Sequence, residues 1–380
     1  MIVSKFNCFT IAIGFFLWSI LGFSLSGHDK LSYSKKATIV GDYDQEQTIV
    51  IAYKDSLSGD SIFLVQRKES NIPLHFFKNI VTDVCFDNEC RLLQVSVYWN
   101  ITGRYLGFDL PPGEFLSKHD HKPFSQDEYE RLNDLLADPN LPLNAVSFEE
   151  LIEIPDLTSD SIDGISGATT KTISEMVVKG AAYTTYTLWN IVHGPTQDLV
   201  VQKTEKQLSP DLIDLILKSP DQSDKVWVLG RITSRTILTK KLTTSLLEII
   251  AGDDFFLAYS ALNALKSSHL ASTSLQSNLF SIYEHADHSI QRMIIEKLMK
   301  TSSLSSTFVV RSRAILGTLN GKQLGDMLKL YANHDINDME TLNVVAKILK
   351  NENRFVSRQT YNFLKSSHLS DQEIEALKNK

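Results

Sequence analysis

The stretch "LKSSHLASTSLQ", residues 265–276, returns as "LKSSHLSDQEIE" at residues 364–375. A weaker copy, "LMKTSSLSSTF", begins at Leu298, so the leucines that open the three copies are spaced by 33 and then by twice that interval. In each copy an apolar helix pattern ends in lysine, and a serine-rich cap opens the next helix. A fixed period of this size is typical of stacked helix pairs.

This recurrence predicts an all-α domain over residues 200–380, and the domain resembles a short solenoid of the HEAT type, although it matches no specific repeat consensus. The alternative is an irregular helical bundle whose serine-rich caps are similar by chance. A solenoid favours a docking surface over catalysis, because its stacked repeats form an extended binding face.

The preceding region, residues 27–195, has a different pattern. Strand-like runs "QTIVIAY" (47–53) and "SIFLVQ" (61–66) come first, and "SQDEYERLNDLLAD" then shows helical spacing after the N-cap candidate Ser125. Because the strands cluster before the helices, we expect an α+β domain and not a doubly wound sheet. The proline and glycine in "HGPTQDL", residues 193–199, mark its boundary with the helical domain.

A β-hairpin is predicted around two cysteines in "VTDVCFDNECRLLQVSVYW". Asp87 and Asn88 are turn formers, and apolar and polar residues alternate from Leu93 to Trp99. Cys85 and Cys90 would then face each other, and in an exported chain such a pair more often forms a structural disulfide than a redox or metal site.

The segment 1–26 is typical of an export signal. Lys5 precedes an uncharged apolar run from Phe9 to Phe23, and Ser24 and Ser26 offer small residues for cleavage. The run is shorter than the ~20 residues of a comfortable bilayer span, and an uncleaved membrane anchor is the alternative. We therefore expect an extracytoplasmic protein, periplasmic or exported.

The net charge of the chain indicates which class of partner it binds. The formal net charge is −7 and the estimated pI is near 5.8, whereas nucleic-acid binders normally carry a basic face. We expect no nucleic-acid partner, and small molecules or proteins are favoured instead.

The most chemically specific stretch is "DGISGATTKTI", residues 163–173. Apolar or small residues follow at helical spacing from Ile173 to Ile191, which predicts that residues 166–170 form the N-terminus of a helix. The free N–H groups there could hold a phosphate, and the glycines would permit close backbone approach. Physical chemistry alone favours a simpler reading, in which a serine or threonine caps the helix and no ligand binds.

The run "DGISGAT" resembles the flavin-attachment signature of the FMN-binding domain family. That family includes the C subunit of the sodium-translocating NADH:quinone oxidoreductase and the G subunit of the Rnf complex. The resemblance implies that Thr169 carries FMN through a phosphoester bond, which a flavin transferase adds outside the cytoplasm. It also implies that Asp163 is recognised by the transferase and that Thr170 is the less suitable acceptor. On chemical grounds, we expect the helix N-terminus and Lys171 to neutralise the phosphate. The residues that complete the motif before the acceptor are Ser166, Gly167 and Ala168.

The resemblance extends weakly over residues 71–193 and stops at residue 200. One segment departs from the family pattern. Family members often have a Glu-Thr-Pro-Gly-like sequence that contributes to the flavin site, and here the segment is "WNITGRYLG", residues 99–107, which keeps only Thr102 and Gly103.

Two functional hypotheses follow. The favoured one is an electron-transfer flavoprotein with covalent FMN, which works with a redox partner protein or a membrane electron-transport complex. It would be an electron carrier or an oxidoreductase subunit, because the flavin would carry the redox chemistry. The sequence has no serine-hydrolase elbow, zinc-protease motif or Walker loop, so hydrolase and nucleotidase functions have little support. The alternative is a cofactor-free interaction protein that uses its helical domain, and the altered segment 99–107 favours it.

Overall fold

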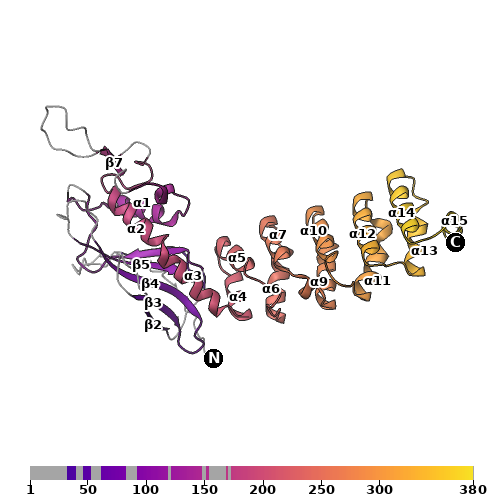
Figure 1. Ribbon diagram of the computed structural model, residues 1–380, viewed down its shortest axis with the longest axis horizontal. Helices are drawn as coiled ribbons and strands as arrows, with labels where there is room; N and C mark the ends of the chain where they lie inside the picture. The colour runs from indigo at the N-terminus through magenta and orange to yellow at the C-terminus, as the bar shows by residue number, and fades with distance from the viewer. Residues whose placement is uncertain are drawn as a thin grey trace, which may run out of the picture.

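The computed structural model describes residues 32–39, 46–52, 61–82, 92–118, 121–147, 151–153, 168–169 and 173–379. Its N-terminal part contains an antiparallel six-stranded sheet (Figure 1). In order across the sheet, the strands are β1 (Ser32–Ser34), β6 (Tyr105–Asp109), β5 (Leu93–Asn100), β4 (Pro73–Thr82), β3 (Ser61–Arg67) and β2 (Glu46–Ala52). Strands β2 to β6 therefore form a meander in which sequence neighbours pair.

The predicted hairpin is confirmed by the pairing of β4 with β5, whose register brings Thr82 opposite Leu93. Alternation along β5 is also as expected, because Val95, Val97 and Trp99 are buried while Gln94 is exposed. Cys85 and Cys90 lie outside the described residues, so their disulfide stays a prediction.

Helices cover one face of this sheet. They are α1 (Gln126–Ala137) and α2 (Ala182–Val192), with the short 3-10 helix η1 (Pro142–Ala145) between them in sequence (Figure 1). The α1 helix begins where the sequence predicts: Ser125 Oγ accepts from the Glu128 N–H at 3.4 Å, and Glu128 Oε2 accepts from the Ser125 N–H at 2.8 Å. This reciprocal cap satisfies two backbone donors. Strands followed by helices make the region α+β, as expected.

The predicted start of the long helix near Thr170 was wrong, because α2 begins only at Ala182. Residues 173–180 form turns, and Gly180 has a φ of 76°, a left-handed conformation that interrupts a helix. Ile173 and Val177 are still buried. The apolar stripe therefore reflects burial of these turns against the domain core and not an earlier helical start.

From Pro195 onward the described chain is helical, and after α3 (Pro195–Gln207) the helices stack in two rows (Figure 1). The first row contains α4 (Pro210–Leu217), α6 (Lys240–Ile250), α9 (Thr273–Tyr283), α11 (Ser306–Ile315), α13 (Met339–Ile348) and α15 (Asp371–Lys378). The second row contains α5 (Gln222–Leu229), α7 (Phe255–Ala264), α10 (His288–Leu298), α12 (Gly321–Asn333) and α14 (Arg354–Ser366). Two short pieces, α8 (Ser267–Leu270) and η3 (Leu316–Thr318), lie in the connections.

The predicted period is confirmed by the helix starts. In the first row α6, α9, α11 and α13 begin at positions 240, 273, 306 and 339, which are 33 apart. In the second row α7, α10, α12 and α14 begin at positions 255, 288, 321 and 354, again 33 apart. The regular stack replaces the alternative of an irregular bundle.

The helix caps repeat with the same period. The second-row caps are Asp221, Asp254, Asp287, Asn320 and Asn353, so each repeat places its cap at the same position. All of these side chains except Asp287 accept a hydrogen bond from a backbone N–H of their own helix. Each such cap typically contributes ~1 kcal/mol to stability. The polar cap residues therefore repeat with the same period as the leucines.

Within the described ranges, no helix combines the length and the apolar character required to cross a membrane.

Candidate functional site

The proposed flavin acceptor lies in a small two-stranded sheet at the edge of the α+β domain. Thr169 and Ala168 form β8 (Ala168–Thr169), which pairs antiparallel with β7 (Ile152–Glu153), so that Thr169 stands opposite Ile152. In Figure 1, β7 lies at the end of the molecule that is remote from the C-terminal helices. The other motif residues, Asp163, Ser166, Gly167, Thr170 and Lys171, lie outside the described residues.

This location changes the expected electrostatics of the attachment point. Thr169 has extended backbone, and the next helix, α2, begins only at Ala182. The sequence suggested that the free N–H groups of a helix N-terminus lie next to Thr169. In the structure, the N–H groups at the start of α2 belong instead to residues around Ala182. The N-terminus of α2 therefore provides no dipole next to Thr169.

The altered segment 99–107 forms the end of β5, a tight turn and β6. Gly103 takes a φ of 85°, which favours glycine at the turn. Asn100 Oδ1 holds the turn by accepting from two backbone donors, the Thr102 N–H at 3.1 Å and the Arg104 N–H at 2.8 Å. These hydrogen bonds close the turn within the segment itself.

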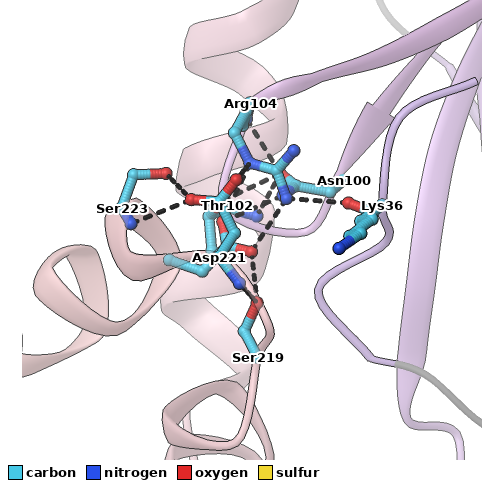
Figure 2. A network of polar contacts seen from close by, with 8 residues as sticks. Lys36, Asn100, Thr102, Arg104, Ser219, Asp221 and Ser223 are labelled. Carbon is cyan, nitrogen blue, oxygen red and sulfur yellow. Dashed lines mark hydrogen bonds and ion pairs between the residues drawn. The ribbon is translucent and has the colours of Figure 1, made fainter.

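The side chains of this turn converge on Asp224 in α5. Figure 2 shows Asn100, Thr102 and Arg104 of the turn beside Ser219, Asp221 and Ser223 of the helical array. Asp224 Oδ1 accepts from Asn100 Nδ2 at 2.9 Å and from the Thr102 hydroxyl at 2.6 Å. Arg104 Nη2 donates to Asp224 Oδ2 at 3.0 Å, and the Ser219 hydroxyl donates to the same oxygen at 2.7 Å. We call Asn100, Thr102, Arg104, Ser219 and Asp224 the Asp224 cluster.

The carboxylate at the centre of the cluster is fully buried, with 0% of Asp224 exposed. Burial alone would raise the pKa of Asp224, but the hydrogen bonds from Arg104, Thr102 and Ser219 outweigh it and hold the pKa below its usual value. Asp224 is therefore an ionised acceptor with several donors, which is the arrangement that a buried charge requires. Arg104 also donates to the backbone carbonyl of Lys36 at 2.9 Å.

The same turn packs against α3. Gln197 Nε2 donates to the Gly103 carbonyl at 2.8 Å, and a Cβ placed on Gly103 would lie 2.6 Å from Val201 Cγ2. Next to the turn, the Trp99 indole N–H donates to the Val192 carbonyl at 2.8 Å. Segment 99–107 is therefore the junction between the sheet and the helical array.

The described residues of segment 99–107 do not fit the role of a flavin pocket. The polar side chains of Asn100, Thr102 and Arg104 are directed to Asp224, so they do not form the ring pocket that the family resemblance would assign to this segment. The described part of segment 99–107 forms a hydrogen-bonded junction to the helical array.

The repeat pattern of the sequence contains a signal for the junction. In the later repeats, the position of Asp224 is occupied by Leu257, Ile290, Gln323 and Val356, and the three apolar residues among them are buried. A carboxylate at a mainly apolar repeat position indicates that the first repeat faces something other than another repeat.

No protein-family model, curated protein or solved structure matches this chain. The FMN-binding and HEAT-like resemblances thus rest on the sequence motifs themselves.

Proposed function

We propose that this chain is an extracytoplasmic electron-transfer flavoprotein that carries FMN on Thr169 through a phosphoester bond. The helical array would dock a redox partner protein or a membrane electron-transport complex. The observation that carries the proposal is the intact "DGISGATTK" run, in which Thr169 is the acceptor position. When bound, FMN would supply the redox chemistry, and Thr169 would serve as its anchor without acting as an acid or base.

The position of Thr169 at the domain edge supports this assignment. A covalently added group must be reached by the flavin transferase, and β7 and β8 stand apart from the six-stranded sheet. The junction supports the second part of the proposal, because the Asp224 cluster fixes the α+β domain to the array. A partner held on the array would therefore be held in a defined relation to that domain.

The test is co-expression with an active flavin transferase in an exporting host, followed by in-gel flavin fluorescence. The unmodified sequence is expected to fluoresce after denaturation, because a phosphoester bond survives it, and Thr169→Val is expected to lose the signal. Thr170→Val is the matched control, and it should keep most of the signal because it leaves the acceptor hydroxyl in place. Fluorescence that survives in Thr169→Val and vanishes in Thr170→Val would move the attachment to Thr170.

A second candidate function is a cofactor-free interaction protein. The commitment of Asn100, Thr102 and Arg104 to Asp224 favours it, because residues that could line a flavin pocket make the domain junction. In this case the chain would stay unmodified beside an active transferase that modifies a control substrate in the same cells.

A further inference from the structure

A cleft of about 460 Å³ lies between the second-row helices α12 and α14. Leu328 and Phe363 form its buried floor, and Phe355 stands at its margin with 55% of its surface exposed. Lys329 and Arg358 are exposed lining residues, and no lining residue is acidic. The cleft is therefore apolar inside and cationic at its edge.

The cleft depends on missing side chains in α12. Gly325 occupies the repeat position that holds Tyr259, Arg292 and Arg358 in other second-row helices. A Cβ on Gly325 would crowd the amide of Gln359, and a Cβ on Gly321 would lie 2.7 Å from Phe355 Cδ1. These two glycines let the side chains of α14 settle against α12, and the depression remains beside them.

Charge distinguishes this cleft from the preceding step of the array. On α10, Arg292 is neutralised by Glu296 at 2.8 Å, and the repeat position of Glu296 is occupied in α12 by Lys329. Cations therefore accumulate on α12 and α14 in a chain whose formal net charge is −7.

Among the described residues, most of the exposed cations on these two helices have no ionic partner. Lys365 of α14 pairs with Asp371 at 3.2 Å. The other exposed cations of α12 and α14 make no ion pair with any residue in the described part of the chain, and they are Lys322, Lys329, Arg354 and Arg358. The two that line the cleft are thus available to an anionic ligand.

We propose that this cleft binds an acidic segment of a partner protein, which inserts an apolar or aromatic side chain beside Phe355 and places carboxylates against Lys329 and Arg358. An apolar floor with a like-charged margin fits a segment with the complementary pattern. Pairing Lys329 and Arg358 with carboxylates costs little free energy, because these cations are solvated and have no ionic partner among the described residues. The two cations would select an acidic partner, and the apolar floor would contribute most of the binding energy. The inference does not depend on the flavin and holds for either proposed function.

The probe is a fluorescein-labelled amphipathic peptide of about 14 residues, with leucine and phenylalanine on one helical face and glutamate elsewhere. Fluorescence anisotropy with the full chain is expected to show saturable binding that weakens with added salt. Two matched peptides, one with lysine for every glutamate and one with serine for every apolar residue, are expected to bind at least about tenfold more weakly.

Two variants test the location. Lys329→Glu combined with Arg358→Glu is expected to weaken binding about tenfold or more, because two attractions become repulsions. The matched control is Lys240→Glu combined with Lys347→Glu, which makes the same charge change at exposed first-row positions and should leave binding unchanged. An unchanged melting temperature in both variants shows that folding is retained, and a photo-crosslinkable leucine in the peptide should label α12 or α14.

Four results would overturn the proposal. They are the absence of saturable binding up to about 1 mM peptide, equal affinity in the two double variants, crosslinks confined to other helices, and a preference for the lysine peptide. Sedimentation velocity of the full chain covers the remaining occupant. Concentration-dependent self-association that the Lys329→Glu, Arg358→Glu variant abolishes would replace the partner with a second copy of this chain.

Discussion

Asp224 is the residue on which the two parts of the molecule meet. Its two oxygens accept from Asn100, Thr102, Arg104 and Ser219, and the first three of these belong to the remote β5–β6 turn. A buried carboxylate is tolerated only when donors surround it, because an unpaired one would have to neutralise or unfold. The buried carboxylate therefore needs these donors, and the buried donors need the carboxylate as their acceptor.

We predict that Asp224→Asn lowers the free energy of unfolding by about 3 kcal/mol, because Arg104 loses its buried anionic partner while the shape of the site is kept. Urea denaturation measures the change. Arg292→Ala, which removes the exposed pair with Glu296, is the matched control and should cost less than about 1 kcal/mol. Equal small losses in both variants would show that the Asp224 cluster does not hold the fold together.

The contribution of Asp224 to stability should also depend on pH. The folded-state pKa of Asp224 is lowered, so its contribution is present above the unfolded pKa of about 3.9 and is lost as the pH falls through the folded value. As the pH is lowered below about 4, the free energy of unfolding of the natural chain should fall more steeply than that of Asp224→Asn. Parallel acid profiles, measured by urea titration at each pH, would contradict this.

At the scale of one element, the first-row helix α9 shows how neighbouring repeats are joined. Gln276, with 1% exposed, donates to the Leu270 carbonyl at 2.8 Å and to the Ser303 carbonyl at 3.0 Å. Its side-chain oxygen accepts from the Ser305 N–H at 2.7 Å, at the cap of α11. One amide therefore satisfies backbone groups in two consecutive repeats.

We predict that Gln276→Leu destabilises the array by about 2 to 3 kcal/mol, because it leaves buried backbone groups without partners. Leucine is the informative replacement, since the buried apolar residues Val309 and Leu342 occupy the equivalent position in the next two repeats. Asn278→Ala, an exposed change in the same helix, should stay within about 0.5 kcal/mol. A neutral Gln276→Leu in thermal and urea unfolding would show that apolar packing alone joins these repeats.

Elements set by local patterns were predictable, and elements set by distant contacts were not. Alternation gave β5, the Ser125 cap gave the start of α1, and the recurrence of "LKSSHL" gave the period of the array. The start of α2 was misplaced because buried turns and a buried helix share the same apolar spacing until Gly180 interrupts it. The role of segment 99–107 was hidden because its partner, Asp224, is remote in sequence.

At the scale of the whole molecule, the array extends from the α+β domain as one continuous stack (Figure 1). Two different contacts hold this relation: the Asp224 cluster, and the packing of Gly103 against Gln197 and Val201 of α3. In a two-row stack each repeat contacts only its neighbours, so the first repeat transmits the position of the domain to all the others.

We predict that the domain and the array move as one body. Spin labels at exposed Glu130 of α1 and Thr244 of α6 should give a narrow distance distribution by pulsed EPR. Arg104→Ala combined with Asp224→Ala should broaden it, because the cluster is removed while the rest of the array is untouched. A broad distribution already in the natural chain would mean that the junction is a hinge.

We propose that this molecule carries FMN on Thr169 at one end of a docking array, and mass spectrometry can detect that group on the residue itself. The chain is co-expressed with an active flavin transferase, and tandem spectra are taken of the peptide that ends at Lys171. We expect a mass gain of one FMN, located on Thr169 and absent from Thr169→Val. An unmodified chain beside a modified control substrate would contradict it and leave the cofactor-free interaction protein as the function.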